Sequence, residues 1–359
     1  MAKRIPLALM ITDTHLSIDR DELVIDIFKQ AIDICLKEKI YLLLHLGDWF
    51  NNRQGQPDHL LVTQKDIIQM VNDAGIHIYT FPGNHDKTNL DSWYSYISVF
   101  ENEMFNVLDG KNGKFRKIIK TATSKELYIH FLPYFKSDKY IECLNLLRKD
   151  IAKGKQNILL THIGVNGVRN NDGSKVDGNI TQEMFKDFVT TFVGHYHDSS
   201  ELPNNIRYIG SAYQANYGEQ IGDKGFHILY DDCSTKFIPS KFPKYIKVRL
   251  NASDKVEIRN SLEMYSDKKY DKDYIRFVFY GKQTDIDKIK NDMSKFTDAG
   301  IEVKTESEEQ EESINAIIND EFVEFNAKTI RKEFIQYCVI NKVPSDKRKY
   351  MLEILNQNL

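Results

Sequence analysis

Short apolar runs alternate with amphipathic segments along the first part of the chain. The runs are Ile5–Thr12, Ile40–Leu46 and Ile76–Tyr79, and the segments between them are Asp21–Glu38 and Asp58–Asn72. In both segments the apolar residues recur at the spacing of one helix face. A continuous apolar run is typical of a strand that is buried on both faces. The alternation therefore predicts a layered α/β sheet, with strands in the runs and helices between them.

The same kind of pattern continues to about residue 230. We expect further strands at Lys117–Thr121, Leu127–Leu132, Asn157–Leu160, Phe188–Val193, Ile206–Tyr213 and Gly225–Tyr230, and helices at Ser92–Glu101 and Asp138–Lys153. The polar, glycine-bearing loop Gly164–Asn179 is a candidate for a substrate-facing lid. Residues 1–240 are therefore predicted to form one large α/β domain.

Composition changes after Phe242-Pro243. Lys241–Lys304 contains 15 lysines and arginines against 11 aspartates and glutamates, a local excess of four positive charges. Two segments there, Tyr245–Leu250 and Tyr274–Tyr280, alternate between apolar and polar residues as strands do. A helix follows, with an apolar face made of Ile286, Ile289, Met293 and Phe296. Residues 241–305 are predicted to form a small α+β domain.

The C-terminal part begins with an acidic stretch. Glu306–Glu324 contains eight acidic residues and no basic one, which is typical of a solvated joint. Ile314–Asn358 has helical apolar spacing in several segments. Residues 306–359 are therefore predicted to be an acidic joint and a helical module, whose apolar stripes either pack on the chain itself or bind a groove on a partner.

Overall composition excludes several classes of protein. Hydrophobic residues make up 41% of the 359 residues, which is enough for a core, and the net charge of −3 shows no global basic field. No apolar stretch approaches the roughly 20 residues that a membrane helix needs. The four cysteines, Cys35, Cys143, Cys233 and Cys338, have no CxxC spacing and are expected to be reduced, buried thiols of a cytoplasmic protein.

Polar residues follow the apolar runs at five places. The groups are Asp13-Thr14-His15, Gly47-Asp48, Gly83-Asn84-His85-Asp86, Thr161-His162 and Gly194-His195-Tyr196-His197. Open α/β sheets bind their ligands at the carboxyl edge of the strands, so these groups are expected to meet there. Packing alone does not readily explain five strand ends that each carry Asp, Asn or His.

These groups supply oxygen and nitrogen ligands but no thiolate. The candidate metal ligands are Asp13, His15, Asp48, Asn84, His162, His195 and His197. Such a set suits Mn²⁺, Fe²⁺ or Zn²⁺, and its size suits two ions. Two ions about 3.5–4 Å apart can hold a phosphate and activate water. Asp48 is expected to bridge them with both carboxylate oxygens, and His85 is the candidate general acid.

A simpler interpretation exists for each residue alone. Lone histidines such as His45, His77, His130 and His227 are usually hydrogen-bonded core residues, and Gly47-Asp48 alone fits a helix cap. The recurrence of these groups after apolar runs favours the metal site for the combined set.

In this order, the five groups resemble the motifs of the calcineurin-like metallophosphoesterase superfamily over roughly residues 5–230. Within that span, Tyr208–Gln214, followed by Tyr217-Gly218-Glu219 and Lys224-Gly225-Phe226, is similar to the SbcD-type recombination nuclease subunits. These are bacterial and phage relatives of the eukaryotic meiotic-recombination nuclease. The resemblance implies a four-layer α/β metallophosphoesterase sandwich flanked by helices, a small DNA-capping domain and a C-terminal helical module.

The resemblance also assigns roles to individual residues. It implies that one Mn²⁺ is held by Asp13, His15, Asp48 and His197, and a second by Asp48, Asn84, His162 and His195. Fe, Zn or Mg are possible substitutes. His85 corresponds to the family's catalytic histidine. Many relatives have a histidine three residues after the bridging aspartate, where this chain has Asn51, so a second catalytic histidine is not expected.

The implied function is that of a Mn²⁺-dependent DNA exonuclease and endonuclease subunit acting at double-strand ends in recombination and repair. Its implied partners are DNA, an SbcC-like SMC-type ATPase bound through the C-terminal helices, and a second copy of the chain. The sequence contains no GxxxxGK[ST], so ATP hydrolysis would come from another subunit. Its place would be the cytoplasm, that of the host if the protein is phage-encoded. No membrane partner is expected.

Three basic residues are candidates for DNA-phosphate contacts, namely Lys247, Arg249 and Arg276 on the alternating strands. A solvated strand face is the alternative for each. Two other functions remain open, a phosphodiesterase or phosphatase on nucleotides or small molecules and a non-catalytic scaffold subunit. A small substrate would need neither the basic domain nor the helical module.

Overall fold

The computed structural model describes residues 4–111, 115–120, 126–169, 175–219, 222 and 224–307 apart from 293 and 298. The described chain forms two compact units. The first contains the chain up to Ile246 together with Lys269–Tyr274, and the second contains Lys247–Lys268 and the described residues from Ile275 on. The predicted C-terminal helical module lies outside the described residues. Within these ranges, no helix is both long enough and apolar enough to cross a membrane.

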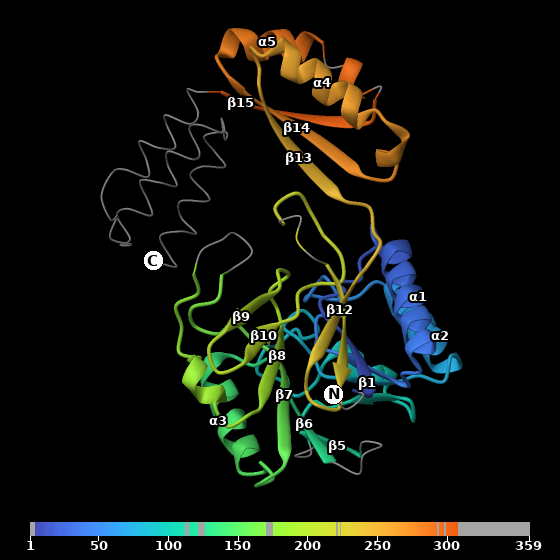
Figure 1. Cartoon of the computed structure of the whole chain (residues 1–359), viewed down its shortest axis with the longest axis vertical. Coiled ribbons are helices and arrows are strands. Elements are labelled where there is room, and N and C mark those ends of the chain that lie inside the picture. The colour runs from blue at the N-terminus through green and yellow to red at the C-terminus, as the bar shows by residue number, and fades with distance from the viewer. Residues whose placement is uncertain are drawn as a thin grey trace, which may run out of the picture. The chain divides into compact units, whose positions relative to one another are not determined.

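The first unit is built on two sheets, each with six strands among the described residues (Figure 1). In order across the first sheet, the strands are β12 (Thr235–Pro239), β11 (Gly225–Tyr230), β1 (Pro6–Ile11), β2 (Leu42–His45), β3 (His77–Thr80) and β4 (Phe105–Val107). Strands β1 to β4 are parallel, and β11 and β12 are antiparallel to their neighbours.

The second sheet has the same kind of parallel centre. Its strands, in order, are β5 (Arg116–Lys120), β6 (Glu126–Leu132), β7 (Gln156–His162), β8 (Thr190–Gly194), β10 (Ile206–Tyr208) and β9 (Ser200–Leu202). Strands β6, β7, β8 and β10 are parallel, whereas the two edge strands are antiparallel to them.

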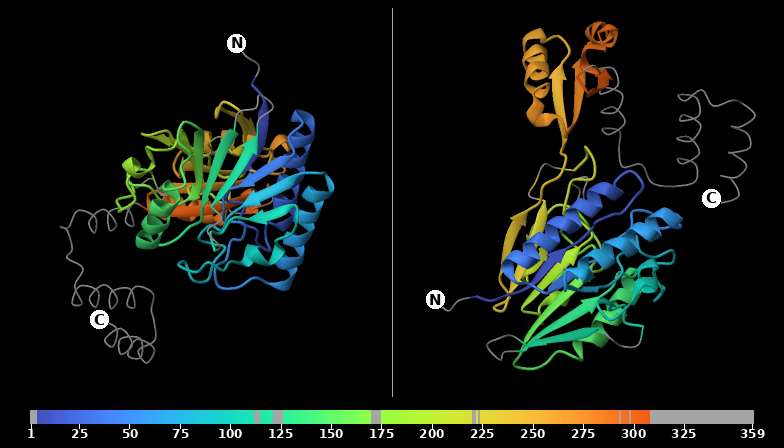
Figure 2. Two further views of the ribbon diagram at one scale, coloured as in Figure 1. Left: turned by 90° about the horizontal axis from the view of Figure 1, so that it is seen from below. Right: turned by 90° about the vertical axis from the view of Figure 1, so that its right-hand side faces the viewer.

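Helices cover the outer faces of the two sheets. Helices α1 (Asp21–Glu38) and α2 (Asp58–Asp73) lie beside one another on the first sheet, and α3 (Ser137–Arg148) packs on the second (Figures 1 and 2). The short 3₁₀ helices η1 (Tyr96–Phe100) and η2 (Gln182–Phe185) lie in connections.

The alternation of side chains along each strand explains the layers. On β1, Leu9 packs in the core under α1 and α2, whereas Met10 points into the core between the two sheets. On β7, Leu159 packs toward α3 and Leu160 joins the core between the sheets. Strands that are buried on both faces have continuous apolar runs for this reason. The expected α/β sandwich flanked by helices is confirmed.

The second unit contains a small sheet covered by helices. Its strands are β13 (Tyr245–Asn251), β14 (Tyr274–Gly281) and β15 (Ile301–Ser307), its helices are α4 (Lys255–Tyr265), α5 (Gln283–Asn291) and α6 (Ser294–Thr297), and the 3₁₀ turn η3 (Lys268–Tyr270) joins the two units. Phe277 and Phe279 on β14 pack against Phe296, which holds α6 on the sheet.

Some element boundaries differ from the prediction. The helix predicted over residues 92–101 is the shorter η1, and α3 ends at Arg148 instead of Lys153. Strand β10 ends at Tyr208 because Gly210 has φ +72°, a left-handed conformation that no strand continues. The single helix predicted after β14 is interrupted between α5 and α6, where Asp292 caps α5. The sequence analysis missed β4, β9, β12, β15 and α4.

Candidate metal centre

The carboxyl ends of five parallel strands deliver the candidate ligands. In the first sheet, Asp13 and His15 follow β1, Asp48 follows β2 and Asn84 follows β3. In the second sheet, His162 ends β7, and His195 and His197 follow β8. Parallel neighbouring strands end at the same edge, so the seven side chains come from two adjoining sheet edges.

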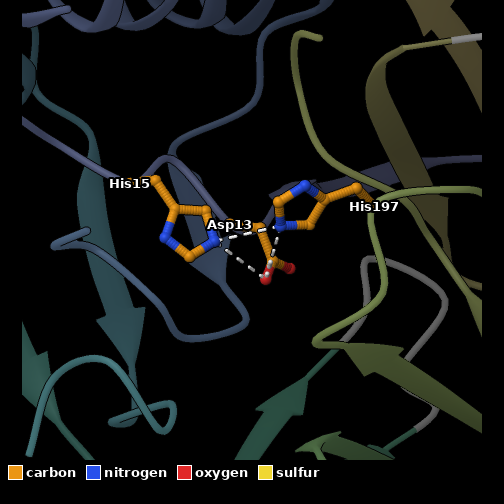
Figure 3. Close-up of side chains that lie close together, drawn as sticks. All are labelled: Asp13, His15 and His197. Atoms are coloured by element: carbon orange, nitrogen blue, oxygen red, sulfur yellow. Dashed lines mark hydrogen bonds and ion pairs between the residues drawn. The ribbon is translucent and has the colours of Figure 1, made fainter. Parts of the chain in front are cut away.

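The first cluster joins Asp13, His15 and His197, whose side chains converge in Figure 3. Asp13 Oδ1 lies 3.6 Å from His15 Nε2 and 3.8 Å from His197 Nε2. The two imidazole nitrogens are 3.0 Å apart. Three potential ligand atoms from β1 and β8 therefore surround one small volume.

The second cluster joins Asp48, Asn84, His162 and His195. His162 Nε2 lies 3.2 Å from Asp48 Oδ2 and 3.2 Å from Asn84 Oδ1. Asn84 Oδ1 is also 2.8 Å from His195 Nδ1. The structure thus brings together all seven residues that the sequence analysis proposed as metal ligands.

Asp48 lies between the clusters, and one of its carboxylate oxygens, Oδ2, faces both of them. Its Oδ2 faces His162 at 3.2 Å and His15 Nε2 at 3.8 Å, while its Oδ1 accepts the backbone N–H of His85 at 2.7 Å. The N–H of His85 uses one lone pair of Oδ1, and the expectation that both carboxylate oxygens bridge two ions stays a prediction.

The arrangement fits divalent cations. Asp13 Oδ1 is buried, and within the described part of the chain it has no hydrogen-bond partner. A buried carboxylate oxygen without a partner is costly unless a cation is bound to it. Ligand atoms bound at about 2.0–2.2 Å to one ion lie roughly 3–3.5 Å from one another, which is close to the spacing in both clusters.

Charge interactions fix the ionisation of the ligands. Burial alone would raise the pKa of the Asp13 carboxyl, but His162, His15 and His197 hold that pKa well below its usual range. Burial would also raise the pKa of Asp48, but the charges of His162 and His15 outweigh it and lower that pKa. Burial and the charge of His162 lower the pKa of His195 to about 3. Burial would likewise lower the pKa of His162, but the charges of Asp48 and Asp13 outweigh it and raise that pKa to about 9. Carboxylate and neutral imidazole are the forms that bind metal ions, so metal binding would displace a proton from His162.

Strained backbone positions the ligands. Four of them, Asp13, His15, Asp48 and His195, have φ values of +53°, +43°, +57° and +92°. Residues other than glycine rarely adopt these values, and such strain is concentrated at functional sites. The local fold therefore holds the backbone of these residues in an unfavourable conformation that directs their side chains into the clusters.

Two glycines allow the ligand loops to approach each other. A Cβ on Gly83 would lie 2.2 Å from Asp48 Oδ1, and a Cβ on Gly194 would lie 2.7 Å from His162 Nδ1. Both distances are below any van der Waals contact. Side chains at these two positions would push Asp48 and His162 out of the clusters.

Asp86 joins the two loops that carry Asp48 and Asn84. Its Oδ2 accepts the backbone N–H groups of Asp48 and Gly83 at 2.9 Å, and its Oδ1 accepts those of Trp49 and Phe50 at 2.9 and 3.2 Å. Burial and the charge of Asp48 raise the pKa of Asp86 to about 7, against the four N–H groups, which favour the carboxylate. The sequence analysis quoted Asp86 in a motif without a role.

Glu219 orients His197 from outside the cluster. His197 Nδ1 is 2.8 Å from Glu219 Oε1, and the buried ammonium of Lys224 lies 3.2 Å from Glu219 Oε2 and 3.1 Å from Asp198 Oδ1. Donation from Nδ1 to a carboxylate leaves the Nε2 lone pair of His197 directed at Asp13. The sequence analysis noted Glu219 and Lys224 only as part of a family resemblance.

Replacing Glu219 by glutamine is expected to weaken Mn²⁺ binding about 10- to 100-fold, because an amide no longer fixes the tautomer or the basicity of His197. Isothermal titration with Mn²⁺ measures the effect. Glu201→Gln is the matched control, because Glu201 pairs with Arg207 on an exposed strand. Equal Mn²⁺ affinity in both variants would show that Glu219 does not support the metal site.

His85 lies beside the clusters with a defined tautomer. Its Nδ1 is 2.6 Å from the backbone carbonyl oxygen of Asn51, and a carbonyl only accepts, so Nδ1 carries the proton. One of its nitrogens lies within 4.8 Å of ligand atoms of His15 and Asp48. The Asn51 position that departs from the family pattern thus contacts His85 through its backbone. Burial lowers the pKa of His85, which favours the neutral ring with a lone pair on Nε2.

A cavity of about 340 Å³ opens over the clusters. Its lining includes His85 and Asn51, together with the two arginines Arg20 and Arg53. The size is in the range of small ligand sites. Guanidinium groups beside such a centre are suited to binding phosphate oxygens.

The remaining histidines mostly follow the simpler interpretation. His45 and His130 are buried, and each bonds to a neighbouring polar side chain. His227 is half-buried and bonds to a backbone carbonyl. His77 is exposed, so its assignment to the core is wrong. It is the first residue of β3 and points away from both cores.

The candidate DNA-binding residues lie on the second unit and differ in their surroundings. Lys247 is exposed. Arg249 pairs with Glu306 at 2.8 Å, and Arg276 pairs with Glu302 at 2.7 Å. A DNA phosphate would have to compete with a carboxylate for either arginine. All three contacts stay predictions.

Several known proteins are similar to this chain. It matches the family described as Calcineurin-like phosphoesterase over residues 8–199, more than half of its length. It is 24% identical to Exonuclease subunit 1 of Enterobacteria phage T4 over 331 residues, which cover 85% of this chain and 91% of that protein.

Two other relatives match shorter regions. The DNA double-strand break repair protein Mre11 of Saccharolobus solfataricus is 29% identical over 174 residues, 46% of this chain and 43% of that protein. The SbcD subunit of the SbcCD nuclease of Staphylococcus epidermidis is 24% identical over 223 residues, 56% of this chain and 58% of that protein. The resemblance to SbcD-type subunits is confirmed. By its fold, its motifs and this match, the chain belongs to the calcineurin-like phosphoesterase family.

Proposed function

We propose that the chain is the nuclease subunit of a DNA repair complex, which hydrolyses phosphodiester bonds at DNA double-strand ends with two Mn²⁺ ions. Fe, Zn or Mg are possible substitutes. The observation that carries the proposal is the pair of ligand clusters that meet at Asp48 Oδ2. The three nuclease and repair relatives support DNA as the substrate.

The side chains divide the work between binding and proton transfer. Asp13, His15, His197 and Asp48 would hold one ion, and Asp48, Asn84, His162 and His195 the other. When bound, two such ions supply Lewis acidity that activates water and neutralises the phosphate oxygens. His85 would first take up a proton on Nε2 and then donate it to the leaving oxygen, while its Nδ1–H, bonded to the Asn51 carbonyl, keeps the ring in place.

The cavity supports a phosphodiester substrate. Arg20 and Arg53 lie on its lining, and their positive charges are available to the non-bridging oxygens of the phosphates that flank the scissile bond. Arg20 is itself held by Asp19, with Nε 3.4 Å from the carboxylate. Contacts to the phosphate backbone position DNA without reading its sequence.

The rest of the chain would serve DNA and partner binding. We assign residues 241–305 to a DNA-capping domain, with Lys247, Arg249 and Arg276 as phosphate contacts. Residues 306–359 would dock on an SMC-type ATPase of the SbcC kind, and two copies of the chain would form a homodimer. Two of the relatives bear the word subunit in their names, which supports an assembly. The complex would work in the cytoplasm, that of the host if the protein is phage-encoded.

The proposal predicts that the purified chain cleaves duplex DNA with Mn²⁺, and that chelation by EDTA abolishes cleavage until Mn²⁺ is restored. The assay uses end-labelled duplex DNA with and without a co-expressed ATPase. Cyclic nucleotides and a small chromogenic phosphodiester are the comparison substrates. Hydrolysis of these small substrates without any cleavage of DNA would point to a small-molecule phosphodiesterase. No metal binding at all would point to a scaffold.

A further inference from the structure

The loop Gln214–Glu219 connects the metal centre to the place where the chain leaves the first unit. Strand β13 begins at Tyr245, and the chain passes into the second unit directly after Ile246. All contacts described below lie within the first unit, on residues that precede this crossing or on the returning segment that ends at Tyr274.

Gln214 binds the first residue of β13 at two points. Its Oε1 accepts the backbone N–H of Tyr245 at 2.9 Å, and its Nε2 donates to the backbone carbonyl of Tyr245 at 3.0 Å. Its Nε2 also donates to the backbone carbonyl of Glu219 at 3.1 Å. The side chain is 1% exposed, so water does not compete with these bonds. One buried amide therefore joins the start of β13 to the end of the loop.

An aromatic contact makes the same connection. The ring of Tyr217, in the middle of the loop, meets the ring of Tyr245 edge to face at 5.0 Å. Tyr245 also stacks on Tyr274 at 4.6 Å and 19°. Tyr274 is the residue at which the chain passes back into the second unit. The first residues of β13 and β14, Tyr245 and Tyr274, are therefore in contact with each other, and Tyr245 also contacts the loop 214–219.

The other end of the loop reaches the metal centre. Glu219 accepts the hydrogen bond that orients His197, and Ala215 and Asn216 line the cavity above the clusters. A displacement of Tyr245 would move this loop, because Gln214 and Tyr217 attach it to the strand. The loop in turn sets the direction of His197 Nε2.

We propose that Gln214 is a positioning residue that couples the start of β13 to the metal centre through the loop 214–219. The inference rests on the proposed metal site at His197. Metal binding at His197 Nε2 strengthens the hydrogen bond from Nδ1 to Glu219 and so stabilises the loop and the bonds to Tyr245. By reciprocity, a change at β13 that weakens the bonds to Tyr245 lowers the metal affinity by the same factor by which metal binding strengthens those bonds. The two ends share a continuous chain of hydrogen bonds, which is the physical requirement for coupling.

The test is hydrogen–deuterium exchange of peptides that cover residues 242–249 in the full chain, with and without Mn²⁺. Added Mn²⁺ is expected to slow exchange of the Tyr245 amide about fivefold or more in the unaltered protein. Gln214→Met keeps the volume of the side chain and removes all three hydrogen bonds. In this variant the Mn²⁺-dependent slowing is expected to disappear, and the Kd for Mn²⁺ to rise about three- to tenfold.

Asn157→Leu is the matched control, because the Asn157 amide also bonds both backbone groups of one residue, Ala152, at 3.1 and 2.9 Å. This control is expected to keep the slowing at Tyr245. Slowing that persists in Gln214→Met, or its absence in an unaltered protein that binds Mn²⁺, would overturn the coupling and leave the proposed function intact. If Gln214→Met does not fold, the unaltered protein alone decides between these outcomes. Absence of Mn²⁺ binding in the unaltered protein would instead refute the metal site itself.

Discussion

Replacing His85 by alanine is expected to lower the rate of DNA hydrolysis about 10²- to 10⁴-fold while two metal ions stay bound. The rate falls because the proposal gives His85 the role of proton donor beside the clusters. The metal ions stay because His85 is not one of the proposed ligands, and its Nδ1 is bonded to the Asn51 carbonyl. Rates at saturating Mn²⁺ and the metal content of the purified variant, measured by mass spectrometry, give the two quantities.

Two further variants make the test specific. His85→Asn retains a side-chain N–H group for the Asn51 carbonyl and lacks an acid, so it is expected to be as slow as His85→Ala. His59→Ala is the control, because His59 is an exposed histidine paired with Asp21. A fast His85→Asn variant would show that the residue acts by position and not as an acid, and full activity in His85→Ala would falsify its assignment.

Replacing Asp48 by asparagine is expected to remove both the metal pair and the activity. The amide oxygen can still accept the N–H of His85, so the loop contact is preserved, but an NH₂ group replaces the Oδ2 that faces His15 and His162. The loss of metal affinity should exceed the roughly 100-fold loss that follows removal of a supporting hydrogen bond. Metal content per chain and DNA hydrolysis are the two measurements.

A control variant separates ligand loss from unfolding. Asp187→Asn serves this purpose, since Asp187 forms an ion pair with Arg148 at the far end of the second sheet. Both variants should melt as folded proteins in thermal unfolding followed by circular dichroism. Two ions bound to a folded Asp48→Asn variant would contradict the assignment of Asp48 as the shared ligand.

The sequence predicted the centre of the fold and the convergence of the candidate ligands, because both depend on local patterns. Strands such as β1 and β7 are buried on both faces and appear as apolar runs. Each ligand follows or ends such a run, so the strand order places Asp48 at the carboxyl edge of the first sheet and His162 at that of the second. The elements that were missed have weaker signals. Only Ile258 of α4 is buried, although Asp254 followed by Glu257 is a recognisable helix start.

The supporting residues could not be predicted in the same way. The roles of Asp86, Glu219 and Gln214 lie in hydrogen bonds to groups distant in the sequence, or to several backbone amides at once. No local periodicity reports such bonds. The hydrogen bond from the N–H of His85 to Asp48 Oδ1 is a further example, because the two residues are 37 positions apart in the sequence.

The four amides gathered by Asp86 have a consequence for how the protein binds its ions. The segments after β2 and β3 are already joined by this carboxylate, so the entropy of ordering them is lost during folding and not during cation capture. The ions would bind to a preorganised site, in which mainly the imidazole rings would have to move. Cation affinity is therefore expected to be higher than in a site whose loops become ordered only on binding.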